Sequence, residues 1–211
     1  WTENRAVWGK TAKNVHEAIE DIENTLPFEI KSFNCDNGSE FLNNRLVEYF
    51  QPGGPRERKR FLMTRSRSYH KNDNAHVEQK NWTHVRQIFG YERFEFKELL
   101  HLMNEVYGVQ NTLTNFFHPQ MKLKSKVRIG GKIKKKYDEA KTPYRRLLAD
   151  PSVPEDAKQK LTAYFEILNP FELREKREKL LSQFFKLKRK LQSSKGASNP
   201  PKLHLVPGNT F

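Results

Sequence analysis

The spacing of apolar residues predicts alternating strands and helices in the first part of the chain. Residues 2–8 are rich in β-forming side chains, which indicates a strand. From Thr11 to Pro27 the apolar residues recur at helical spacing, on one stripe formed by Val15, Ala18, Ile19, Ile22 and Leu26. Residues 28–36 alternate again with a one-residue slip, as in a strand with a bulge. Strand, helix and strand in this order are typical of an α/β layer.

The pattern continues to residue 118. We expect a short helix over 42–50, a strand over 61–64, a cationic loop over 65–74, and helices over 75–89 and 94–117. His118 and Pro119 end this part of the chain. Residues 1–118 are therefore predicted to form a mixed α/β core.

Beyond residue 118 the pattern changes. Residues 122–136 alternate basic and apolar side chains around Gly130-Gly131, which predicts a two-stranded ribbon. Asn169, with Glu172 three positions later, is a capping box that opens a helix to about Leu191. Leucines in that helix recur every seven residues, which fits either a coiled-coil seam or packing on the core. We expect a basic, mainly helical region over 119–192 and a disordered tail over 193–211.

The charge is divided unevenly between these parts. The 211 residues carry a net charge of +14, and residues 1–50 and 51–118 contribute −4 and +4 respectively. Residues 119–211 therefore hold the whole excess of +14. A basic extension on a separate core indicates a polyanionic partner, with nucleic acid as the leading candidate and solubilising charge as the alternative.

Composition narrows the class of protein. No apolar run approaches the roughly 18–20 residues of a membrane span, so we expect no membrane association. Cys35 is the single cysteine, which excludes an internal disulfide and favours a reducing, intracellular setting. The chain begins at Trp1 without a Met or a signal-peptide pattern, and we interpret it as a fragment.

Two carboxylates are placed where chemistry often occurs. Asp36 ends a predicted strand beside a glycine turn, and Glu78 lies early on the helix that follows the cationic loop. Two such carboxylates facing each other could hold Mg²⁺, which prefers oxygen ligands. The alternative is that Asp36 starts an Asx turn and Glu78 is a surface charge.

The segments around these carboxylates resemble a known family. Asp36-Asn37-Gly38-Ser39-Glu40-Phe41 and Asn74-Ala75-His76-Val77-Glu78-Gln79-Lys80-Asn81 are similar to the last two parts of the Asp-Asp-Glu signature of retroviral-integrase-like catalytic cores. Thr142-Pro143-Tyr144 and Leu168-Asn169-Pro170 resemble the tail of the bacterial insertion-sequence transposases. The resemblance implies a ribonuclease-H-like α/β core whose opening strands are missing.

The resemblance has two departures. Asp36 and Glu78 are separated by 41 residues, more than is usual in the superfamily, and the 52–55 loop can absorb the excess. The first Asp of the signature is absent. In the family it lies on the opening strand, whereas this chain is expected to begin on the third strand. Glu3 would lie on the wrong strand to replace it. We therefore expect this chain alone to be catalytically inactive.

The resemblance also implies an activity for the parent protein. Asp36 and Glu78 would be catalytic residues and ligands of two Mg²⁺ or Mn²⁺ ions that support cutting and joining of DNA ends in transposition or integration. Expected partners are double-stranded DNA, as element ends and target, and further copies of the chain, in the cytoplasm of a bacterium near the nucleoid. The alternative is a non-catalytic DNA-binding or assembly module.

Candidate DNA contacts lie around Glu78 and in the basic ribbon. Trp82 is expected to pack in the core or against a helix, with base stacking as the alternative. The basic run 186–190 is expected to meet DNA backbone. The remaining candidates are Arg65, Arg67, Lys71, Asn74, Lys80, Asn81, Lys132, Lys134, Lys135 and Lys136.

Overall fold

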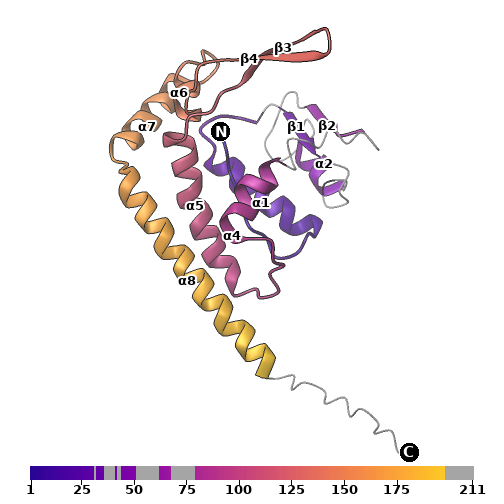
Figure 1. Ribbon diagram of the computed structural model, residues 1–211, viewed down its shortest axis with the longest axis vertical. Coiled ribbons are helices and arrows are strands. Elements are labelled where there is room, and N and C mark those ends of the chain that lie inside the picture. Colours follow the sequence, from indigo (N-terminus) through magenta and orange to yellow (C-terminus); the bar gives the residue numbers. More distant parts are fainter. Residues whose placement is uncertain (31, 36–40, 42–43, 51–61, 68–78, 198–211) are drawn as a thin grey trace, which may run out of the picture.

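The computed structural model describes residues 1–30, 32–35, 41, 44–50, 62–67 and 79–197, and within them the chain is a mixed α/β structure (Figure 1). No helix among these residues is both long enough and apolar enough to span a membrane. The elements are α1 (Ala12–Thr25), β1 (Ser32–Cys35), α2 (Asn44–Phe50), β2 (Leu62–Arg65), the π-helix η2 (Trp82–Arg86), α4 (Gln87–Phe89), α5 (Leu99–Phe117), β3 (Leu123–Ile129), β4 (Lys132–Tyr137), α6 (Pro143–Leu148), α7 (Glu155–Glu166) and α8 (Pro170–Ala197).

A small parallel unit forms the front of the chain. β1 and β2 pair in parallel, with Ser32 opposite Leu62 and Cys35 opposite Arg65. α2 connects them in sequence, and its buried face joins the apolar side of α1, a helix that begins after Thr11 as expected and is capped by the Thr11 hydroxyl. The shared cluster is Leu46, Tyr49 and Phe50, surrounded by Val15, Ile19, Phe33 and Phe41.

The strand expected over residues 2–8 is wrong, because this segment pairs with side chains of a helix instead of with a strand. The backbone N–H of Thr2 donates to Asn115 Oδ1 at 2.8 Å, and Asn115 Nδ2 donates back to the Thr2 carbonyl at 2.8 Å. Asn104 makes the same double contact with Ala6, at 2.8 and 3.1 Å. The primary amide supplies one donor and one acceptor, so each asparagine satisfies one residue's backbone as a neighbouring strand would.

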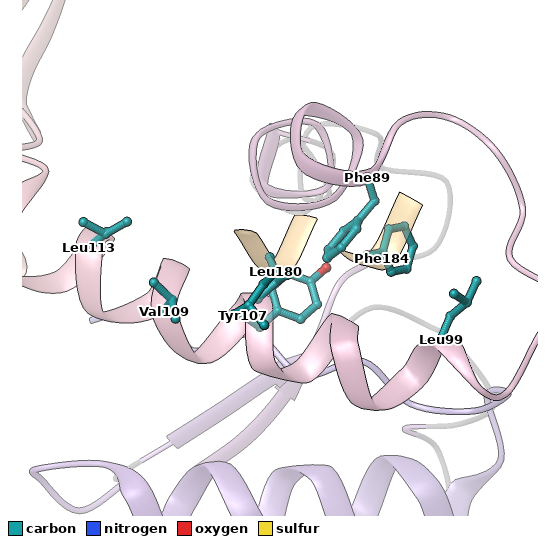
Figure 2. Packing of buried hydrophobic residues seen from close by; sticks show 8 residues of the cluster. Phe89, Leu99, Tyr107, Val109, Leu113, Leu180 and Phe184 are labelled. Atoms are coloured by element: carbon teal, nitrogen blue, oxygen red, sulfur yellow. The ribbon is translucent and has the colours of Figure 1, made fainter. Parts of the chain in front are cut away.

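The largest core lies between α5 and α8, which run side by side (Figure 1). Phe184 and Leu180 of α8 pack against α5 and against Phe89, the last residue of α4 (Figure 2). The leucines spaced by seven residues therefore pack on the core, and in the described part of the chain they do not form a coiled-coil seam. The basic back part is thus joined to the front by a common core, while the division at residue 118 stays a prediction.

The ends of α8 are partly as expected. Asn169 caps the helix through Oδ1, which accepts from the Phe171 N–H at 3.0 Å, and its Nδ2 donates to Glu172 at 2.9 Å. The helix does not end near residue 191 but continues to Ala197, so the expected disorder is wrong for 193–197. Within this extension the Ser193 hydroxyl donates to the Arg189 carbonyl one turn earlier, at 2.9 Å. Residues 198–211 lie outside the described part.

The helix expected over 75–89 is confirmed where it is described, from Gln79, but it contains the π-helical turn η2. Trp82 and Phe89 are seven residues apart and would share a face of a regular α-helix. Phe89 is 1% exposed, whereas Trp82 is 45% exposed and contacts the Tyr91 ring at 5.8 Å between centroids. The wider π turn changes the angular register of the two residues. Of the two places expected for Trp82, the core is therefore wrong.

Two further boundaries differ from the sequence pattern. Residues 28–30 do not extend β1, and α5 begins at Leu99, not at residue 94. Phe94 leaves the helix because its ring packs against Phe184 at 5.4 Å between centroids. Tertiary packing here overrides local helical periodicity.

Candidate functional site

The two carboxylates proposed as metal ligands, Asp36 and Glu78, lie outside the described residues, as do Lys71 and Asn74. Their flanking residues are described. Cys35, immediately before Asp36, is buried at the end of β1 and faces Arg65 at the end of β2. The carboxyl ends of both parallel strands therefore meet at the position where the first acidic motif begins.

The flanks of the two acidic motifs border one cavity. Its volume is about 600 Å³, and it lies between α1, the segment 3–7, α5 and the helix that follows Glu78. Phe41 comes from the first motif, and Lys80 and Asn81 come from the second. Lys80 and Asn81 are both exposed, so their polar groups are available at the rim. The structure thus brings the described ends of both motifs to the same place.

Glu3 also lines this cavity, but its carboxylate is already occupied. Oε1 accepts from the Trp1 indole N–H at 2.9 Å, and Oε2 accepts from Arg5 at 3.1 Å and from Asn111 at 2.9 Å. The side chain is 12% exposed. A carboxylate that accepts three hydrogen bonds is a poor candidate for a replacement metal ligand. Among the residues the structure describes, no group of three His, Cys, Asp or Glu could hold a metal ion.

His84 is a residue of this cavity that sequence analysis missed. It is buried, and its Nδ1 has no hydrogen-bond partner among the described residues. Burial, and to a smaller degree the charge of Lys80, lowers the pKa of the imidazole, so the ring is neutral at pH 7. It lies in a polar helical stretch with no metal-binding spacing, and nothing in the pattern distinguishes it from a surface histidine.

The predicted basic ribbon is confirmed as the antiparallel pair β3–β4. Every residue of both strands is exposed, including Lys132, Lys134, Lys135 and Lys136. Gly130 has a φ of 58°, a conformation that suits glycine in the tight turn between the strands. Between residues 122 and 137 the chain has eight Lys or Arg and no Asp or Glu. The ribbon is thus a solvent-facing element whose charged side chains are all cationic.

An ion pair that the sequence did not indicate fixes the base of the ribbon. Arg146 of α6 donates from two nitrogens to the carboxylate of Asp138, at 2.6 and 3.2 Å, and to the Gln120 carbonyl at 2.7 Å. The backbone N–H of Lys122 also donates to this carboxylate, at 2.5 Å. These hydrogen bonds, that of Arg146 first, lower the pKa of Asp138 to about 2. The ends of β3 and β4 are therefore held together on α6.

The remaining basic candidates are placed differently. Arg67 is exposed just after β2, and Arg65 ends that strand. Lys188, part of the run expected to meet DNA, is buried and forms an ion pair with Glu92. Its ammonium group also lies 5.5 Å from the ring centroid of Phe94. Lys188 therefore serves packing, and the expectation that it contacts DNA is wrong.

Comparison with known proteins adds one distant relative. No family model and no solved structure matches the chain. Over 146 residues the chain is 35% identical to an uncharacterized protein, y4rM, of Sinorhizobium fredii. The matched region covers 69% of this chain but 40% of that protein, so the chain spans less than half of the relative's length.

Proposed function

We propose that the chain is a DNA-binding part of an Asp-Asp-Glu transposase or integrase with a ribonuclease-H-like core, whose parent protein cuts and joins DNA ends. The observation that carries this proposal is the shared cavity, because Phe41, five positions after Asp36, and Lys80, two positions after Glu78, both border it. Phe41 and Lys80 are 39 positions apart along the chain, and their meeting at one cavity supports a site assembled from both motifs.

The order of elements adds support. A strand that ends at the first acidic motif, a short helix, a second parallel strand and then the helix after Glu78 follow the order expected of such a core. Ligands of open α/β sheets bind beyond the carboxyl ends of the strands, where Asp36 is located in the sequence.

In this proposal Asp36, Glu78 and a third carboxylate hold two Mg²⁺ or Mn²⁺ ions, which would activate the attacking oxygen and stabilise the leaving one. Lys80 and Asn81, exposed at the cavity rim, would contact the DNA end. The ribbon would bind phosphates without recognising sequence. Assembly as a homo-multimer in the bacterial cytoplasm belongs to the same proposal.

Metal binding tests the assignment. Mn²⁺ titrated into the chain should bind weakly, and Asp36→Asn or Glu78→Gln should each remove that binding because both carboxylates share the ion. Glu20→Gln, an exposed carboxylate of α1, is the matched control and should change nothing. Equal Mn²⁺ affinity in all four proteins would refute the assignment of the site.

Catalysis is the second measurement. The chain alone should not nick DNA. It would supply two carboxylates of the proposed site, Asp36 and Glu78, and the site needs a third to hold both metal ions. A longer protein that supplies the first Asp should cleave DNA ends with Mg²⁺, and Glu78→Gln in it should abolish cleavage while DNA binding persists. If the longer protein bound DNA but cleaved nothing, the chain would be the non-catalytic DNA-binding module that the exposed basic ribbon equally favours.

A further inference from the structure

We propose that the β3–β4 ribbon enters the major groove of duplex DNA edge-on, with each of its two faces against one phosphate wall. The inference rests on the proposed function only in taking DNA as the partner, and it requires no catalysis. The charge, pairing and dimensions of the ribbon carry it.

The register places cations on both faces of the ribbon. Residues directly opposite each other in an antiparallel pair share a face, and successive residues alternate between faces. Ile129 is opposite Lys132, and Val127 is opposite Lys134, so one face carries Lys132, Lys134 and Lys136. The other face carries Lys126, Arg128 and Lys135.

Three cations on each face are not what a flat docking surface needs. An element that lies on a membrane or along the outside of a duplex presents its charge on one side and leaves the other side to the solvent. A groove has phosphates on both walls, so an inserted ribbon meets anions on both sides. The symmetric distribution therefore favours a groove over a flat anionic surface.

One pair shows that the free ribbon carries unbalanced repulsion. Lys126 is directly opposite Lys135 on the same face, an arrangement that destabilises an isolated pair of strands. The carboxylate of Asp138, at the base of the ribbon, is already bound by Arg146. Negative charge supplied by a partner would offset this repulsion.

The dimensions select the major groove. Stacked sheets with interdigitated side chains lie about 10 Å apart, so a ribbon whose side chains lie along its faces has a comparable thickness. The major groove is roughly 12 Å wide and 8.5 Å deep and admits a two-stranded ribbon, whereas the minor groove is only about 6 Å wide. Near the turn, Ile129 and Ile133 are 56% and 54% exposed, and the register places them on opposite faces of the ribbon.

The attachment at the base of the ribbon fixes the direction in which the ribbon points. The ribbon extends away from the junction of α5 and α6 (Figure 1). Arg146 and Asp138 join both of its strands to α6, so its exposed end is presented in a fixed orientation. A ribbon attached rigidly at one end can enter a groove with little loss of conformational entropy.

Two triple variants of the chain test whether both faces bind. One is Lys132→Gln, Lys134→Gln and Lys136→Gln; the other is Lys126→Gln, Arg128→Gln and Lys135→Gln. The control replaces three exposed lysines elsewhere with Gln, namely Lys10, Lys13 and Lys97. All substituted side chains are exposed, so circular dichroism should show folded proteins.

The readout is the affinity for a duplex of mixed sequence as a function of salt. The slope of log K against log salt is about −0.9 per phosphate neutralised, so each ribbon variant should lose up to about 2.7 of slope and the control almost none. If only one face changed the slope, the ribbon would lie flat and the groove assignment would fail while DNA binding stood. If neither face did, the ribbon would not be a DNA contact.

Chemical protection tests the groove itself. Dimethyl sulfate modifies guanine N7 in the major groove and adenine N3 in the minor groove, and the chain should protect the guanines alone. Protection of adenine N3 would overturn the proposal. Binding to vesicles with anionic lipid but not to duplex DNA would replace DNA by a membrane surface and would refute the proposed partner as well. None of these measurements depends on metal-dependent cleavage. A failure of the ribbon proposal can therefore be told apart from a failure of the catalytic assignment.

Discussion

Replacing Asn115 by Ala should release the N-terminal segment from α5. Asn115 is 1% exposed and makes two hydrogen bonds of 2.8 Å with the backbone of Thr2. The substitution removes both and leaves a half-buried N–H and carbonyl without partners. At about 1–3 kcal/mol for each unsatisfied group, reduced because the Thr2 backbone is only partly buried, the free energy of unfolding should fall by about 2–4 kcal/mol.

The ladder predicts a graded series along the segment. Asn104 makes equivalent bonds with Ala6 but is less buried, so Asn104→Ala should cost about 1–2 kcal/mol. Asn115→Asp keeps an acceptor for the Thr2 N–H but loses the donor to its carbonyl and buries a charge, so it should be no more stable than Asn115→Ala. Gln159→Ala, an exposed amide of α7, is the control.

Urea unfolding measures the global effect, and hydrogen exchange of residues 1–8 measures local release. If the segment detaches without global unfolding, exchange at Thr2 and Ala6 should accelerate while the urea midpoint moves little. A lower free energy of unfolding and faster exchange confined to residues 1–8 would each fit a segment held by Asn115. If Asn115→Ala left the unfolding free energy within 0.5 kcal/mol of the parent and exchange unchanged, the two bonds would not hold the segment.

Three further predictions concern single contacts. Lys188→Ala should destabilise the protein by about 1–2 kcal/mol through lost packing of its stem, whereas Lys188→Met should be nearly neutral; chemical denaturation separates them. Arg146→Gln should raise the pKa of Asp138 from about 2 towards 3.8, as carbon-13 NMR would report, and an unchanged value would exclude the ion pair as its cause. Because folding lowers the pKa of His84 below 6.5, the unfolding free energy should be highest above pH 6.5 and fall as the pH drops, and His84→Gln should flatten this dependence.

Local signals were sufficient for elements that are stabilised by their own residues. The helix starts at Thr11 and Asn169 and the turn at Gly130 each depend on residues within three positions, and all three lie where the pattern predicts them. The expected strand at residues 2–8 failed for the opposite reason. Its hydrogen-bond partners are Asn104 and Asn115, about a hundred positions away, which no local pattern indicates.

The candidate site divides in the same way. The exposure of Lys132, Lys134, Lys135 and Lys136 could be predicted because so dense a run of bases is costly to bury without carboxylate partners. The burial of Lys188 could not, because it depends on Glu92 and Phe94 in a distant loop. The pKa of His84 is lowered mainly by burial against segments that are distant in the sequence, and to a smaller degree by Lys80. Whether Asp36 and Glu78 share an ion stays a prediction.

The π-helical turn at Trp82–Arg86 has a consequence for how this helix could be changed. A residue inserted into a helix advances the preceding turns by about 100° relative to those that follow. Deleting Thr83 and restoring a regular α-helix would therefore rotate Lys80 and Asn81 away from the cavity while Phe89 kept its place in the core. The number of residues in this turn, and not their chemistry, thus sets the orientation of the segment after Glu78. A change of length within the turn would alter the candidate site while the core packing of Phe89 persisted.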